Sequence, residues 1–366
     1  MIDRRLLINI DWVLAGLVVT VCLLGILNIY SATTPYKIVG TAYYIKQCYW
    51  MLVGLFVALT VCSLDYHILE DLSYWFYGLL LFLLIAVLVI GKRSMGATRW
   101  LNLGVMNIQP SELMKIVIIV TFARFFNSFQ EAGGLRVKDV LIPFCLLALP
   151  AALIMKQPDL GTATLVILIA LSMILYVGLR WSTIFTFVCV TIPMAWVGWS
   201  FLLRPYQKNR VLDFLNPERS RLGSGYHIIQ SKIAVGSGGF AGKGFVKGTQ
   251  SQLRFLPEQH TDFAFSVFAE EWGFLGCLLL IIIYLLLVLW GLNIARRCND
   301  RFGSLLAVGV TAMLFWHIVI NMGMVIGLFP VVGVPLPFFS YGGTSMITSM
   351  VGIGLLQNIS MRRFMF

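Results

Sequence analysis

Four carboxylates and a histidine gather where a polar stretch of the chain runs into an apolar one. Glu258, His260, Asp262, Glu270 and Glu271 all lie within fourteen residues. Asp262 and Glu270 are eight residues apart, so they share one face if this segment is helical. Helix capping accounts for Asp262, but not for two further carboxylates that enter an apolar helix. Such groups are suited to proton transfer and to binding a polar substrate, so we interpret the cluster as functional.

A second polar group contains an arginine, an acid and a lysine. Arg99 precedes an apolar segment that begins at Pro110, and Glu112 and Lys115 lie in the first turns of that segment. Because Glu112 and Lys115 are three residues apart, they share a helix face and are able to form an ion pair. Two interpretations stay open for this pair: it locks helices together, or it binds an anionic head group.

A third group is a very short turn that joins two long apolar runs and carries both Lys156 and Asp159. Asp159 immediately precedes the second run, where an aspartate commonly caps a helix. The alternative is a carboxylate that lines a cavity or binds a metal ion. The sequence leaves both interpretations open.

The composition excludes an ordinary water-soluble protein. Of 366 residues, 59% are hydrophobic and 12% are charged, whereas soluble domains carry about 25% charged residues. The net charge of +11 does not indicate a nucleic-acid-binding protein, because the basic residues are spread over short segments and form no stripe. His317 and Asn321 are interpreted as partners in interhelical hydrogen bonds, and His67 and His227 as isolated histidines.

Ten apolar segments are long enough to cross a membrane as helices. They lie at about 12–30, 48–64, 74–91, 110–127, 138–155, 161–179, 182–203, 271–293, 304–328 and 341–359. A membrane barrel is excluded, because it would show alternating strands of about ten residues. The sequence therefore predicts an all-α, polytopic membrane helix bundle that forms a single domain over residues 1–366.

The distribution of Lys and Arg predicts that both termini lie in the cytoplasm, because cytoplasmic loops carry the excess of these residues. With this orientation, eleven basic residues lie in short inside segments and six in short outside loops. The inside set is Arg4, Arg5, Arg124, Arg136, Lys138, Arg180, Arg296, Arg297, Arg301, Arg362 and Arg363, and the outside set is Lys37, Lys46, Lys92, Arg93, Arg99 and Lys156.

One long hydrophilic stretch, about 204–262, then faces outward between the seventh and eighth spans. It contains Arg210 and Lys232 and a glycine run at 236–244. The run lacks the ending of a phosphate-binding loop, and we expect it to provide flexibility near a substrate. A turn rich in proline and glycine at 335–343 is expected to re-enter the membrane and close one wall of a cavity.

Three motifs taken together resemble the SEDS family (shape, elongation, division and sporulation proteins). They are Gln-Pro-Asp-Leu-Gly-Thr at 157–162, His-Thr-Asp-Phe at 260–263 with the two glutamates that follow, and Pro-Phe-Phe-Ser-Tyr-Gly-Gly at 337–343. The resemblance extends over nearly the whole chain. The short polar ends are most similar to the member of the family that acts in rod-shape elongation.

This resemblance implies a peptidoglycan glycosyltransferase in the bacterial cytoplasmic (inner) membrane. The enzyme would polymerise lipid II at the outer face, and its partner would be a class B penicillin-binding protein, the elongation transpeptidase. Asp262 corresponds to the catalytic aspartate, for which we expect the role of general base. The alternatives are a lipid II flippase or a non-catalytic scaffold that activates the penicillin-binding protein.

The leaving pyrophosphate in this reaction needs positive charge nearby. Candidates are Arg99, Lys115, Arg210 and Lys232, and the acidic residues and histidine named above complete the expected substrate-binding set. No cofactor is required by the sequence. A divalent cation (Mg²⁺ or Mn²⁺) beside Asp159 or Glu112 is an alternative source of charge.

Overall fold

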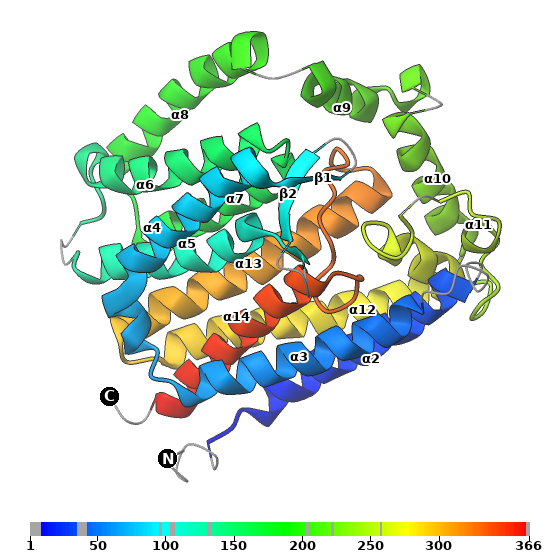
Figure 1. The fold of residues 1–366 in the computed structure, drawn as a ribbon, viewed down its shortest axis with the longest axis horizontal. Coiled ribbons are helices and arrows are strands. Elements are labelled where there is room, and N and C mark those ends of the chain that lie inside the picture. The colour runs from blue at the N-terminus through cyan, green and yellow to red at the C-terminus, as the bar shows by residue number, and fades with distance from the viewer. Residues whose placement is uncertain are drawn as a thin grey trace.

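The computed structural model describes residues 9–34, 42–94, 97–102, 107–129, 133–202, 205–220, 223–256 and 258–363. Arg4, Arg5 and Lys37, which contribute to the predicted orientation, lie outside the described residues. The chain is predominantly helical, as predicted. The long helices lie side by side in a bundle, and a smaller set of polar helices lies at one end of it (Figure 1).

Every predicted apolar segment coincides with a helix. These helices are α2 (Trp12–Thr33), α3 (Tyr43–Ser63), α4 (His67–Ile90), α5 (Pro110–Asn127), α6 (Val137–Lys156), α7 (Leu160–Val177), α8 (Trp181–Val197), α12 (Ala264–Arg297), α13 (Arg301–Ile326) and α14 (Gly343–Arg362). A short π-helix, η2 (Gly198–Leu202), continues α8.

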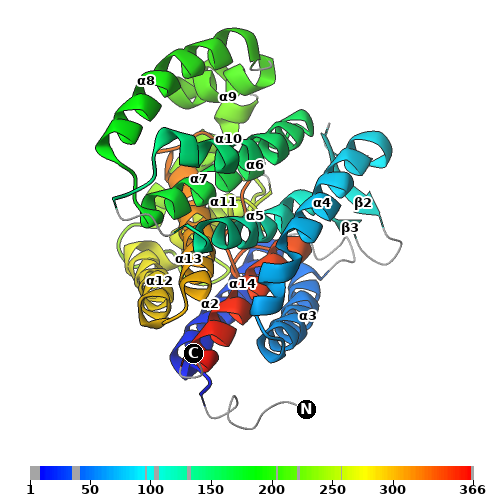
Figure 2. The same cartoon turned by 90° about the vertical axis from the view of Figure 1, so that its left-hand side faces the viewer.

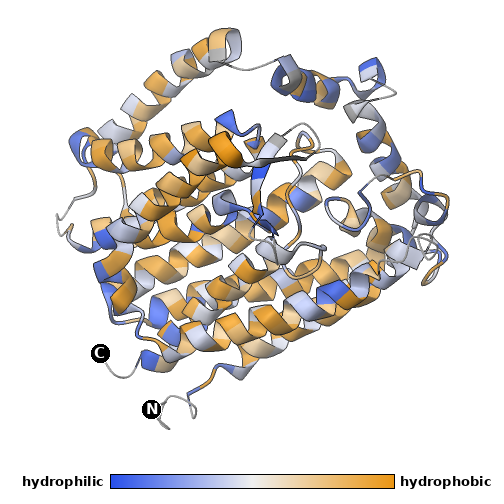
Figure 3. Cartoon of the chain, viewed as in Figure 1, coloured by the Kyte–Doolittle hydropathy of each residue, from blue (hydrophilic) through white to orange (hydrophobic). Residues whose placement is uncertain are grey.

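Eight helices of the described residues are long and apolar enough to cross a membrane. The other two of the predicted ten, α5 and α14, carry more polar residues and are largely buried within the bundle. The protein is therefore a polytopic membrane protein, whereas ten crossings and the orientation of the termini stay predictions. Figure 3 shows the apolar bundle and the more hydrophilic helices at its polar end.

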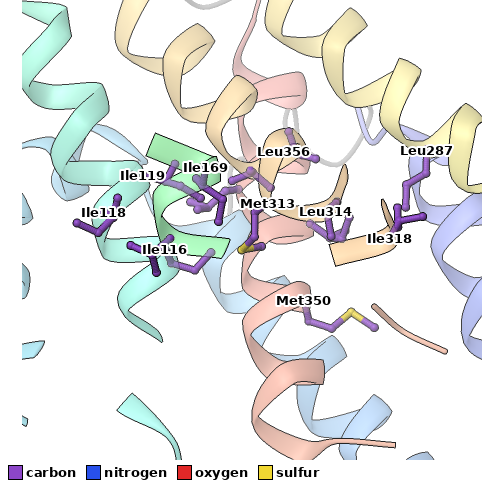
Figure 4. Close-up of a cluster of buried hydrophobic side chains, with 14 of the residues drawn as sticks. Ile116, Ile118, Ile119, Ile169, Leu287, Met313, Leu314, Ile318, Met350 and Leu356 are labelled. Atoms are coloured by element: carbon purple, nitrogen blue, oxygen red, sulfur yellow. The ribbon is translucent and has the colours of Figure 1, made fainter. Parts of the chain in front are cut away.

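The bundle is organised around α13, most of whose residues are buried. It packs against α5, α7, α12 and α14, and α14 packs closely against α3 (Figure 2). Small residues allow these close contacts: a Cβ on Gly309 would lie 2.4 Å from Ile119 Cγ2, and one on Gly354 would lie 2.8 Å from the Ala58 carbonyl oxygen. Figure 4 shows part of the resulting core, with Ile119, Ile169 and Met313 among its buried side chains.

The stretch between α8 and α12 is mostly helical, which the sequence analysis did not predict. It contains α9 (Pro205–Leu215), the 3₁₀-helix η3 (Pro217–Ser220), α10 (Ser224–Ser237) and α11 (Thr249–Gln252). A three-stranded antiparallel sheet was also not predicted, and it consists of β1 (Lys92–Ser94), β2 (Ala97–Asn102) and β3 (Asn107–Ile108) in that order. Figure 1 places both sets of elements away from the two chain ends.

Two glycines of the run at 236–244 pack closely against α12, so flexibility does not explain these two positions. A Cβ on Gly238 would lie 2.1 Å from the carbonyl oxygen of Ala269, and one on Gly242 would lie 2.1 Å from that of Glu271. Gly273, which interrupts α12 with φ +64°, lies against the backbone at Gly242. The glycines permit two backbones to approach each other, which any larger residue would prevent.

Candidate functional site

Asp262 lies in the turn that precedes α12 and is held there from two sides. Asn321 of α13 donates from Nδ2 to the carbonyl oxygen of Asp262 (3.0 Å) and to that of Val334 (2.6 Å). A Cβ on Gly333, which has φ +72°, would lie 3.1 Å from Asp262 Oδ2. The segment that follows α13 therefore lies beside the Asp262 carboxylate at Gly333, whereas the expected cavity wall formed by the turn at 335–343 stays a prediction.

The surroundings of Asp262 raise the pKa of its carboxyl group to about 6, from 3.8. Burial is the largest cause, and the charges of Glu258 and Asp159 add to it, whereas Arg210 and Arg99 lower the pKa. A carboxylate with this pKa is mostly ionised at neutral pH and still accepts a proton readily. These are the properties of a general base that operates near pH 7.

Two guanidinium groups from separate elements lie near enough to Asp262 for their charges to lower its pKa. Arg210, on α9, donates from Nη1 to the carbonyl oxygen of Val331 (3.1 Å). Arg99, on β2, donates from Nη2 to the carbonyl oxygen of Pro158, and its Nη1 lies 3.8 Å from Asp159 Oδ1. The buried Nε of Arg99 has no hydrogen-bond partner among the described residues. The arginines can therefore provide donors to an anionic ligand beside Asp262.

Asp159 is 2% exposed and performs the capping role considered from the sequence. It accepts from the backbone N–H of Thr162 (3.4 Å), from Thr162 Oγ1 (2.9 Å) and from Gln109 Nε2 (2.8 Å). Ser111 Oγ is a fourth donor at 3.4 Å. A carboxylate that is already so fully hydrogen-bonded does not fit a resident metal ion.

Metal binding has no other support in the described part of the chain. No group of three or more His, Cys, Asp or Glu residues is arranged there to hold a metal ion. Glu112, the second residue considered for a cation, is paired with Lys115. A divalent cation thus stays a prediction, and no catalytic step is assigned to it.

Two histidines flank the Asp262 turn. His260 lies between Tyr43 and Tyr341, with ring centroids 4.5 and 5.8 Å away, and its carbonyl oxygen accepts from the Tyr341 N–H (2.9 Å). His227, on α10, stacks on Phe263 at 6.2 Å. Burial lowers the pKa of both imidazoles, and the nearby charge of Glu258 opposes this effect. Burial therefore favours the neutral form of both rings.

His227 was not recognised from the sequence as a candidate for the site. An isolated histidine gives no metal or catalytic spacing, and nothing in the sequence analysis placed α10 beside Phe263. The charges that act on His227 are those of Glu258 and Arg210, which also act on Asp262. Gln109 and Asn321 are further residues of the site that sequence reasoning did not assign to it, since their contacts are long-range.

Glu270 and Glu271 lie in α12, and their contacts are with the outer segment. Glu270 is fully buried and binds Lys243 Nζ (2.7 Å), Thr249 Oγ1 (3.0 Å) and the Gln250 N–H (3.1 Å). Glu271 accepts a hydrogen bond from Ser31 of α2. These contacts support a role in anchoring the segment before α12, and substrate binding by the two glutamates stays a prediction.

The expected common helix face of Asp262 and Glu270 is wrong, because α12 begins only at Ala264. Asp262 instead lies in the turn before α12, where the charges of Arg99 and Arg210 act on it. Glu258, with φ +47°, is exposed within the same turn and contributes its charge to the site.

The Glu112–Lys115 pair is confirmed, with a distance of 2.8 Å between Oε1 and Nζ. Lys115 is fully buried and also lies 2.7 Å from Nε2 of His317. This contact confirms His317 as an interhelical partner. Lys232 is exposed on α10, and its side chain lies against Gly327 at the end of α13. Neither lysine is among the charges that act on Asp262, and their binding to substrate stays a prediction.

The fold and this site define a polytopic membrane protein with a partly buried, base-like aspartate and two arginines near one end of its helix bundle. Residues 11–364 match the family model described as "Cell cycle protein", which covers FtsW, RodA and SpoVE. The chain belongs to this family, and the resemblance to SEDS proteins is confirmed.

Relatives in the family carry names that state an activity. The chain is 44% identical to "Peptidoglycan glycosyltransferase MrdB" of Escherichia coli (strain K12), over 86% of this chain and 84% of that protein. It is 34% identical to "Peptidoglycan glycosyltransferase RodA" of Treponema pallidum (strain Nichols), over 97% of this chain and 98% of that protein.

Solved structures share the fold over almost the whole length. One is described as "Structural coordination of polymerization and crosslinking by a peptidoglycan synthase complex", with a TM-score of 0.83 and 33% identity over 98% of this chain and 99% of that one. Another is the rod-shape-determining protein RodA of Thermus thermophilus, with a TM-score of 0.72 and 29% identity over 97% and 98% of the two chains.

Proposed function

We propose that this protein is a peptidoglycan glycosyltransferase that polymerises lipid II at the outer face of the cytoplasmic membrane during cell elongation. The observation that carries the proposal is the Asp262 carboxylate, whose pKa is raised to about 6 beside Arg99 and Arg210. The names of the relatives from Escherichia coli and Treponema pallidum support the same activity.

In the proposed reaction, Asp262 removes the proton from the 4-hydroxyl group of the acceptor sugar. The acceptor oxygen forms a bond to the anomeric carbon of the donor, and the bond from that carbon to the pyrophosphate oxygen breaks. A general base of this kind contributes roughly 10²–10⁴-fold to the rate. The energy of the pyrophosphate linkage drives the reaction, so that no nucleotide is consumed.

The leaving undecaprenyl pyrophosphate takes the electron pair of the broken bond and becomes more negative. Arg99 and Arg210 are suited to stabilise this charge, because guanidinium groups bind phosphate oxygens with two parallel hydrogen bonds. Both are held by backbone carbonyl groups at Pro158 and Val331. Their positions are therefore set before the substrate binds, which reduces the reorganisation needed in the transition state.

The expected partner is a class B penicillin-binding protein that cross-links the glycan product. The related structure described by its coordination of polymerization and crosslinking supports this assignment. In the proposed orientation both termini lie in the cytoplasm and Asp262 lies toward the outer surface. Cysteine labelling of exposed positions on α9 and α10 tests the orientation, and a cytoplasmic location of these helices would refute the mechanism.

A lipid II flippase or a non-catalytic scaffold are the alternative functions. A transporter is expected to carry polar groups through the depth of its bundle, whereas here the base and the two arginines are gathered near one end. A scaffold needs no carboxylate with an elevated pKa.

The decisive experiment measures glycan made from purified lipid II by the protein reconstituted with its penicillin-binding partner. An inhibitor of the polymerase domains of other penicillin-binding proteins suppresses contaminating activity. Wild type should form glycan, and Asp262→Asn should form almost none while still binding the partner. Asp159→Asn is the matched control, because it also removes one nearby carboxylate charge, and it should retain more activity than Asp262→Asn.

Equal activity of wild type and Asp262→Asn would remove Asp262 from the chemistry. If neither polymerises lipid II but wild type moves it between leaflets of a vesicle, the flippase function replaces the proposal. The same assay with EDTA, followed by Mg²⁺ or Mn²⁺, tests the predicted need for a divalent cation.

A further inference from the structure

An apolar cavity lies between α2, α3 and α14, in the half of the bundle opposite Asp262. Its volume is about 460 Å³, within the size range of pockets that bind small molecules. Trp12 and Leu59 are exposed at its edge (72% and 60%), and Val18, Ala58 and Met350 form a buried inner surface. Figure 4 shows Met350 projecting from α14 apart from the other labelled side chains. The cavity therefore opens on the surface that faces lipid.

The shape of this cavity suits a single flexible chain. Its lining extends from Trp12 to Cys22 on α2, which is about 15 Å at a rise of 1.5 Å per residue. A hydrocarbon chain follows such an extended apolar lining, whereas an apolar lining excludes stable water.

One polar group in the lining lacks a partner. Gln357, on α14, is 8% exposed, and its Nε2 has no hydrogen-bond acceptor among the described residues. A buried donor without an acceptor is unfavourable. A ligand that brings an acceptor to Gln357 while it fills the apolar space would remove this cost.

The position of Gln357 along α14 identifies the acceptor. It lies five residues before Arg362, about 7.5 Å along the helix axis, and Arg362 forms an ion pair with Asp65 (3.2 Å) at the end of the bundle where the two chain ends lie. The interfacial region of a bilayer is about 5–8 Å thick on each side of the hydrocarbon. If Arg362 lies among the lipid head groups, this spacing places Gln357 near the level of the ester carbonyl groups of phospholipids.

We infer that this cavity binds one acyl chain of a glycerophospholipid, whose ester carbonyl oxygen accepts a hydrogen bond from Gln357 Nε2. A polyprenyl phosphate would supply an apolar chain but no carbonyl group at this level, so it satisfies only half of the site. The cavity is formed by the first half of α2 and the second half of α14, whereas Asp262 lies beyond the opposite ends of these helices. The lipid site is thus separate from the proposed catalytic site.

The test uses the full chain in nanodiscs of phosphatidylethanolamine and phosphatidylglycerol, with a trace of phosphatidylglycerol that carries a diazirine on one acyl chain. After irradiation, mass spectrometry measures label on α3 and α14 peptides relative to the exposed residues Trp75 and Phe82 of α4, which report contact with bulk lipid. Wild type should show a clear excess on the cavity peptides.

Two tryptophan variants separate cavity binding from bulk contact. Ala15 lines the cavity, so Ala15→Trp should fill it and remove the excess label. Val13, on the same helix, is 48% exposed and does not line the cavity, so Val13→Trp should leave the labelling unchanged. Equal labelling in wild type and Ala15→Trp would refute the site.

The hydrogen bond is tested with Gln357→Met, which keeps the length of the side chain and removes the donor. Loss of one hydrogen bond of about 0.5–1.5 kcal/mol corresponds to a reduction of about two- to twelvefold in occupancy. An ether-linked phosphatidylglycerol probe has no ester carbonyl oxygen, so its occupancy in wild type should be lower than that of the ester-linked probe by the same factor. Its occupancy should be equal in wild type and Gln357→Met. Unchanged labelling of Gln357→Met by the ester-linked probe would refute the role of the carbonyl group.

Competition identifies the source of the chain. Unlabelled phosphatidylglycerol should displace the probe, and an equal amount of undecaprenyl phosphate should not. The opposite order would mean that the cavity is an isoprenoid site, which contradicts the inference. Co-purification of a protein segment crosslinked in the cavity would contradict it as well.

Discussion

The elevated pKa of Asp262 makes the pH dependence of polymerisation a direct test of its role as a base. If the carboxylate must be ionised to accept the proton, the rate depends on the ionised fraction. With a pKa of about 6, this fraction is about 0.9 at pH 7 and about 0.1 at pH 5, and the rate should fall about tenfold. A carboxyl group with the ordinary pKa of 3.8 would give almost equal rates at these two pH values.

Neighbouring charges should move the midpoint of this pH profile in opposite directions. Glu258→Gln removes a negative charge that raises the pKa of Asp262, so the midpoint should fall. Arg210→Gln removes a positive charge that lowers it, so the midpoint should rise. Partly exposed pairs of charges contribute about 0.2–1 kcal/mol, which corresponds to roughly 0.2–0.7 pH units for each substitution.

The measurement is the initial rate of glycan formation between pH 4.5 and 8 at saturating lipid II and constant ionic strength. Burial lowers the pKa of His260 and His227 below the ordinary 6.5, so both imidazoles also change charge on the acidic side of neutral pH. If the acidic limb of the profile reports Asp262 alone, the variants His260→Asn and His227→Asn should keep it. The reasoning is refuted if either variant loses this limb, or if the wild-type rates at pH 5 and pH 7 agree.

Three further predictions concern stability and packing. The pKa of Asp262 is raised in the folded protein, so the stabilisation by its protonated form is complete below about pH 4 and is lost as the pH rises through about 6. Asp262→Asn should therefore raise the melting temperature at pH 7.5. This difference from wild type should shrink toward pH 4. Lys115→Met leaves the Glu112 carboxylate buried without its partner and should cost about 3–5 kcal/mol, whereas Lys115→Met combined with Glu112→Leu should recover most of the loss in chemical unfolding. Gly238→Ala should abolish activity and lower the melting temperature because its Cβ would overlap the Ala269 carbonyl oxygen, while Gly236→Ala, with open space around the added Cβ, should resemble wild type.

The bundle was largely predictable because hydropathy over about twenty residues is a strong local signal. The pairing of Glu112 with Lys115 was predictable for a similar reason, since helix geometry alone places residues three apart on one face. The cap formed by Asp159 also follows from its position directly before an apolar run. Each of these predictions depends on residues that are close together in the sequence.

The composition of the site was less predictable, because its residues come from distant parts of the chain. Nothing local indicates that Arg99 and Arg210 act on the same carboxylate, or that His227 stacks on Phe263. The glycine run was misinterpreted in part for the same reason. Flexibility and close packing require the same residue type, and only the neighbouring backbone of α12 distinguishes them.

The burial of α14 has a consequence for biogenesis. Ribosomes synthesise this helix after all the others described here, yet it lies against α3, which is among the first to be made. Asn358 of α14 donates to the carbonyl oxygens of Val61 (2.7 Å) and Leu64 (2.5 Å) at the end of α3. The face of α3 that packs against α14 therefore stays uncovered until α14 has been translated and inserted.

The residues just before α14 also reach the Asp262 turn, since the Tyr341 N–H donates to the His260 carbonyl oxygen. A nascent chain that stalls before this point is inserted in the membrane but lacks this contact beside Asp262.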